Sequence, residues 1–182
     1  MGTVDEALAA TRDMLVDLGR IIPAQYLMAK EYARSLSNFV LVKFNGITKR
    51  LSDEISRVSP TFVFTTVATL DQAPSNEIRS VAEKLKYDPN TKDFHQVVVL
   101  NLTAGDVTSR IVVSFHGVGA AFRGLLVAVA YFQVGAGDAV PISEDVFRIS
   151  YQEPGNEIVP RFEKWLEPCV VEGIANWRRT LV

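Results

Sequence analysis

The stretch FHQVVVLNLTAGDVTSRIVVSFH, residues 94–116, decides the fold of this chain. Two runs rich in β-forming residues, 94–104 and 107–116, flank the pair Gly105-Asp106. A glycine in the first position is typical of a two-residue type II′ turn. The pattern therefore predicts an antiparallel β-hairpin, and a two-residue loop fixes which residues pair across it.

The two faces of this hairpin differ in chemistry. The predicted pairs on one face are almost all apolar: Ala104 with Val107, Leu102 with Ser109, Leu100 with Ile111 and Val98 with Val113. The other face ends on the only two histidines of the sequence, with His95 opposite His116. Directly opposed Cβ atoms lie about 4.5–5.5 Å apart, so we expect the two imidazoles to be close enough to share a proton or a metal ion.

A carboxylate lies next to this histidine pair. Asp93 precedes His95 by two residues and therefore belongs to the same face. Two histidines and one carboxylate can hold a divalent metal with open coordination positions, so Asp93, His95 and His116 are candidate metal ligands and the two histidines are candidate catalytic residues. The alternative is that both histidines merely cover a half-exposed face, with no cofactor, and a longer loop would separate them.

The N-terminal third has a helical pattern. Thr3 and Glu6 form a capping box ahead of a stripe at three- and four-residue spacing, made of Val4, Leu8, Leu15, Leu18 and Ile22. Pro23 predicts an interruption, and the same spacing resumes from Ala29 to Val58. We therefore expect two helices that could pair. A strand over 38–44, ending at Asn45-Gly46, is the competing interpretation.

The remaining chain mixes strands and helices. Strands are expected over 61–70 and 146–151. A short helix capped by Ser75 or Asn76 is expected to run through Glu77 to Leu85, and a closing helix is expected to be capped by Asn156 and kinked or divided at Pro168. The apolar segment 120–134 fits either a buried strand or a buried helix. On the last helix Cys169 lies on the apolar side, which favours a core role for this thiol.

This order of elements predicts an α+β protein. A helical arm of two helices over residues 1–59 is expected to pack on, or project from, an α+β domain over residues 60–182 with a largely antiparallel sheet. No motif in the sequence identifies a family.

Composition excludes several functional classes. The 182 residues include 19 basic and 21 acidic side chains, a balance that gives no field for nucleic-acid binding. One cysteine and two histidines cannot form an intramolecular disulfide or a zinc site of four such ligands. No secretory signal and no membrane span are visible, so a cytoplasmic location is expected.

Two functions follow as hypotheses. A long apolar helical stripe must be buried, and another copy of the chain is the simplest partner, so the first hypothesis is a non-catalytic assembly protein that self-associates through its N-terminal helices, with other protein partners also open. The second is a metal-dependent enzyme or small-ligand binder that uses His95, His116 and Asp93.

Overall fold

The computed structural model describes residues 3–69, 76–85, 95–116, 126–149 and 155–182. Within them the chain is α+β, with helical elements around a six-stranded antiparallel sheet. The elements are α1 (Val4–Leu51), the π-helical turn η1 (Ser52–Ser56), β1 (Phe62–Thr69), α2 (Asn76–Leu85), β2 (His95–Ala104), β3 (Val107–His116), β4 (Leu126–Val134), β5 (Val140–Pro141), β6 (Phe147–Ile149) and α3 (Gly155–Thr180).

The predicted hairpin is confirmed as β2 and β3. Ala104 pairs with Val107, and the register continues without a slip to the last pair of the two strands. Gly105 has a φ of 62°, a backbone conformation that glycine adopts without steric cost. The sheet order is β1-β2-β3-β4-β5, and β6 also pairs with β4.

The other strands follow the sequence in part. The strands predicted over 61–70 and 146–151 are present as β1 and the shorter β6, and the short helix α2 is present as expected. The ambiguous segment 120–134 is a strand from Leu126 onward, and its beginning lies outside the described residues. β5 was not predicted, because Val140-Pro141 is too short to give an alternating pattern.

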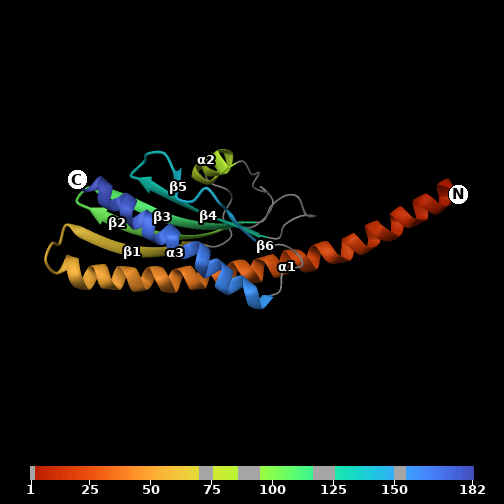
Figure 1. Ribbon diagram of the computed structural model, residues 1–182, viewed down its shortest axis with the longest axis horizontal. Coiled ribbons are helices and arrows are strands. Elements are labelled where there is room, and N and C mark those ends of the chain that lie inside the picture. The colour runs from red at the N-terminus through yellow and green to blue at the C-terminus, as the bar shows by residue number, and fades with distance from the viewer. Residues whose placement is uncertain (1–2, 70–75, 86–94, 117–125, 150–154) are drawn as a thin grey trace.

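The predicted break at Pro23 is wrong. α1 is one helix of 48 residues that runs through the proline, so residues 3–59 form neither a two-helix arm nor a helical hairpin. An interior proline removes one backbone hydrogen bond at a cost of about 3 kcal/mol, but it ends a helix only where another conformation recovers more. Figure 1 shows the ribbon continuing from the projecting N-terminal part onto the sheet.

The alternative strand over 38–44 is also wrong, because this stretch belongs to α1. Its helical stripe is buried against the sheet at Ala33, Leu36, Val40 and Phe44, each at most 1% exposed. The stripe ends earlier than expected: Val58 is 84% exposed, because the helix has ended before it.

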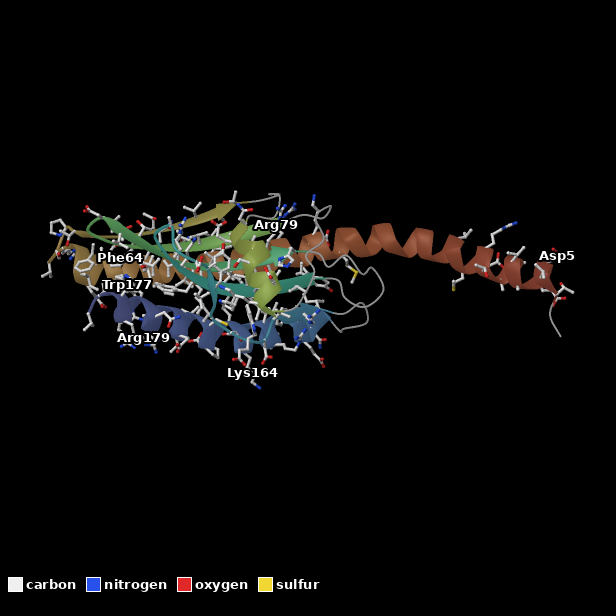
Figure 2. The ribbon with its side chains drawn as sticks, turned by 90° about the horizontal axis from the view of Figure 1, so that it is seen from above. Asp5, Phe64, Arg79, Lys164, Trp177 and Arg179 are labelled. Atoms are coloured by element: carbon white, nitrogen blue, oxygen red, sulfur yellow. The ribbon has the colours of Figure 1, made fainter. Side chains whose placement is uncertain are left out.

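The sheet is covered on both faces. The second half of α1 and the whole of α3 pack on one face, and α2 lies on the other (Figures 1 and 2). The larger core joins α1 and α3 to the sheet, with Phe162 of α3 at its centre, and the smaller core joins Ile78 and Val81 of α2 to Val112, Val129 and Tyr131. Helix α3 begins one residue before the predicted cap Asn156 and is not divided at Pro168.

The two halves of α1 have different environments. The N-terminal half projects beyond the end of the sheet in Figure 1, and its side chains Val4 and Leu8 are 74% and 62% exposed. The Thr3 cap is confirmed, since Thr3 Oγ1 accepts a hydrogen bond from the Glu6 backbone N–H at 3.3 Å. None of the described helices is long and apolar enough to cross a membrane.

Candidate functional site

His95 and His116 are paired across β2 and β3, as the sequence predicts. They are the last pair of the hairpin, at the end of the strands farthest from the Gly105-Asp106 turn. The confirmed register leaves no room for the longer loop that would have separated them. The position of the two histidines therefore follows from the turn and the period of the strands.

The hydrogen-bond pattern of the sheet defines this pair further. Gly105 N–H donates to Thr61 O at 2.9 Å, so the odd-numbered residues of β2 point their backbone groups toward β1. Gly135 N–H donates to Thr108 O at 2.8 Å, so the even-numbered residues of β3 point theirs toward β4. His95 and His116 therefore form a non-hydrogen-bonded pair, the type in which opposed Cα atoms are closest, at about 4.5 Å.

The environment of His116 differs from the expected half-exposed face. His116 and Ser114 are both 0% exposed, and Val112 on the same face of β3 is 2% exposed. The expectation of two histidines covering a surface is therefore wrong for His116. The Ser114 Oγ atom has no hydrogen-bond partner among the described residues.

The predicted metal set is described only in part. Asp93 lies outside the described residues, and so does the side chain of His95. Among the side chains that the structure describes, no group of three or more histidine, cysteine, aspartate or glutamate residues could hold a metal ion. The structure thus brings the two histidine positions together, and the described residues add no third ligand.

Polar residues continue along this face toward the turn. Arg110, on the same face of β3, donates from Nη2 to Gly135 O at 2.8 Å, and Gln133 Nε2 of β4 donates to Gly137 O at 2.7 Å. The pKa of Tyr131 is raised to about 12, chiefly by burial and also by the Glu77 carboxylate of α2, while Arg110 acts to lower it. The alternation of β3 is sufficient to place Arg110 and Ser114 on the face of His116. Glu77 and Tyr131 come close to this face only through the packing of α2 and β4, which the sequence pattern does not show.

A groove of about 950 Å³ lies between α1 and α3. Three basic and three acidic side chains line it, and two of them, Lys43 and Glu167, form an ion pair. The lining residues are Lys43, Asn156, Glu157, Pro160, Arg161, Glu163, Lys164 and Glu167. Because its charges balance, the groove does not select a ligand of either sign.

The single cysteine belongs to the core. Cys169 is 3% exposed, and its burial raises the pKa of the thiol from 9.0 to about 11. A thiol of this kind is protonated at neutral pH and is a poor nucleophile. The prediction of a core role for Cys169 is confirmed.

Comparison with known proteins finds no match among family models, curated proteins or solved structures. A function for this chain is therefore inferred from its own geometry.

Proposed function

We propose that this chain is an assembly protein that self-associates through the projecting N-terminal half of α1. The observation that carries the proposal is a helix of which one half packs on the sheet and the other half extends past it, with large aliphatic side chains in water (Figure 2). An extended helix with an apolar stripe gains most from burying that stripe against another helix.

The spacing of the aliphatic residues matches a coiled-coil seam. Over residues 4–22 a seven-residue repeat places aliphatic residues at five of six a and d positions. The a positions are Leu8, Leu15 and Ile22, and the d positions are Val4, Thr11 and Leu18. The sixth position is polar, and its hydroxyl, Thr11 Oγ1, donates to Ala7 O at 2.8 Å within the same helix. A seam of this composition favours association of two or more helices.

Burial energies support the same conclusion. Complete burial of one leucine or valine side chain contributes about 1.5–3 kcal/mol. A partner helix would cover Val4 and Leu8, which are 74% and 62% exposed. In each copy, Leu36, Val40 and Phe44 would anchor the other half of α1 to the sheet.

The test is the molar mass of the full chain in solution, measured by light scattering over a range of concentrations. We expect the wild-type chain to be a dimer or larger, and Leu8→Glu to shift it toward monomer by placing a charge in the seam. Ala9→Glu is the matched control, because Ala9 is exposed on the same turn but lies at a b position. Since both side chains are exposed, neither change should unfold the chain.

Two results would overturn this proposal. One is a wild-type chain that stays monomeric at every concentration. The other is equal weakening by Leu8→Glu and Ala9→Glu, because that outcome would show that added charge alone, without regard to the seam, drives the effect.

A second candidate function is binding of a divalent metal or small ligand at the histidine pair. The observation that favours it is the pairing of His95 with His116 at a non-hydrogen-bonded position, beside the buried Ser114. Two imidazoles at this separation can ligate one ion, and Asp93 is the proposed third ligand. Metal-dependent catalysis by this chain would require that the histidine pair binds a metal ion.

Metal analysis tests the second candidate. The wild-type chain, purified without chelator, is expected to hold metal that His95→Ala and His116→Ala both lose. Because His116 is buried, the thermal stability of each variant is recorded with and without added Zn²⁺. Equal and negligible metal in all three proteins, together with no effect of Zn²⁺ on the unfolding of the wild-type chain, removes this candidate.

A further inference from the structure

β1 is an edge strand, and its outer edge offers backbone groups to a partner. Because the odd-numbered residues of β2 face β1, their partners Val63, Thr65, Val67 and Thr69 use their backbone groups within the sheet. The backbone N–H and C=O groups of Phe64, Thr66 and Ala68 therefore point away from the sheet. Among the described elements none lies beyond this edge, and Figure 2 shows β1 at the rim of the sheet.

The strand lacks the features that usually protect an edge. Native edges carry lysines, prolines or bulges, or are very short. The sequence of β1, FVFTTVAT, has no charged residue, no proline and no glycine, and its eight residues pair with β2 without a bulge. Val63 and Val67 of β1 are on the same face of the sheet as α2, and they are still 50% and 47% exposed. This edge is therefore suited to a further strand.

We propose that this strand is β1 of a second copy of the chain, paired antiparallel about a twofold axis at Thr65. Only residues whose backbone groups point outward can form hydrogen-bonded pairs, and this axis joins Phe64 to Thr66 of the other copy. The same register places Thr65 opposite Thr65 and Val63 opposite Val67 across the interface, so threonine meets threonine and valine meets valine. The absence of charge means that two identical strands do not repel each other.

This interface is separate from the one under Proposed function. It uses the strand edge rather than the projecting half of α1. Because β1 runs alongside α1 (Figure 1), an antiparallel β1 pair would direct the projecting halves of the two α1 helices toward opposite ends of the assembly. The projecting half of α1 in each copy would then be free to bind a further copy, so the two interfaces together would extend the assembly beyond a dimer.

The experiment is oxidative crosslinking of the full-length Thr65→Cys variant. At a non-hydrogen-bonded pair on the twofold axis, the two Cα atoms would lie within the range that a disulfide spans. The native Cys169 does not compete, since it is 3% exposed. The matched control is Val107→Cys, which is on the same sheet and 48% exposed but distant from this edge in the strand order.

We expect Thr65→Cys to form a crosslinked dimer at least about tenfold faster than Val107→Cys, because paired thiols react at a high effective concentration. In the Thr65→Cys background, Val67→Lys should abolish the difference by placing a charge opposite Val63, whereas Val107→Lys should preserve it. Equal crosslinking of the two cysteine variants overturns the proposal. Leu8→Glu in the Thr65→Cys background distinguishes the two interfaces. Crosslinking that persists in this double variant supports the β1 interface even if the helical interface of α1 is lost.

Discussion

Gly173 of α3 lies directly against Ile111 of β3. A Cβ atom at position 173 would be 2.8 Å from Ile111 Cδ1 and 3.0 Å from Cγ1. Ile111 is itself 1% exposed, so its side chain has little space in which to move. The close approach of helix and sheet thus depends on the missing side chain.

Gly173→Ala should therefore lower the free energy of unfolding by about 1–3 kcal/mol, the usual cost of overpacking a core. Urea unfolding followed by circular dichroism measures it. Gly46→Ala is the control, because Gly46 is in the interior of α1 with no atom within 4 Å of the added Cβ. It should raise the stability by about 0.5–1 kcal/mol through helix propensity alone. Two changes of the same sign would contradict the packing argument.

The fold could be predicted from the sequence where local chemistry decides it. Gly105-Asp106 and the alternation on either side of it are sufficient to set the register that pairs His95 with His116. In the segment 120–134 apolar residues cover every face, so its strand could not be distinguished from a helix by periodicity. Its identity depends on β3, with which it pairs.

The helix break expected at Pro23 is absent for a related reason. The local rule gives the cost of a proline in a helix, but whether the helix continues depends on what the flanking stretches pack against. The stripe from Ala33 to Phe44 is buried on the sheet. The burial of His116 cannot be predicted for the same reason, because the sequence pattern of a hairpin does not indicate which elements cover each of its faces.

Phe162 joins the aromatic side chains of the larger core. Its ring centroid lies 5.1 Å from that of Phe147, 5.6 Å from that of Phe115 and 6.0 Å from that of Phe39. These partners come from β6, β3 and α1, so one side chain connects three elements. Phe162→Ala should cost about 3–5 kcal/mol, and Phe162→Leu should cost clearly less because it leaves a smaller cavity. Chemical denaturation gives both values, and equal losses would contradict a cavity origin.

A buried hydrogen bond attaches α1 to β2. Ser37 Oγ donates to Gln96 Oε1 at 3.0 Å, and the two residues are 5% and 3% exposed. Ser37→Ala leaves the Gln96 carbonyl oxygen without this donor, and the expected loss of stability is about 1–3 kcal/mol.

The control for this hydrogen bond is Ser35→Ala at an exposed position of the same helix. It should be neutral or slightly stabilising, because alanine is the better helix former. Thermal unfolding of the two variants side by side makes the comparison. A loss at Ser37 no larger than the change at Ser35 would show that the hydrogen bond contributes nothing.

The buried thiol of Cys169 should make the chain less stable in alkali. Burial raises the pKa of this thiol from 9.0 to about 11. Above pH 9 the unfolded chain therefore loses a proton that the folded chain keeps, so the unfolded state binds fewer protons and stability falls as the pH rises toward 11. The slope can reach about 1.4 kcal/mol per pH unit between the two pKa values.

Cys169→Ala removes this contribution to the slope, whatever it does to the stability at neutral pH. Urea unfolding at several pH values from about 8 to 10 measures the slope below the range in which Tyr131, with its pKa raised to about 12, contributes most. We expect the stability of the wild-type chain to fall more steeply than that of Cys169→Ala. Parallel curves for the two proteins would show that the thiol titrates alike in the folded and unfolded chains, and hence that burial does not hold its proton.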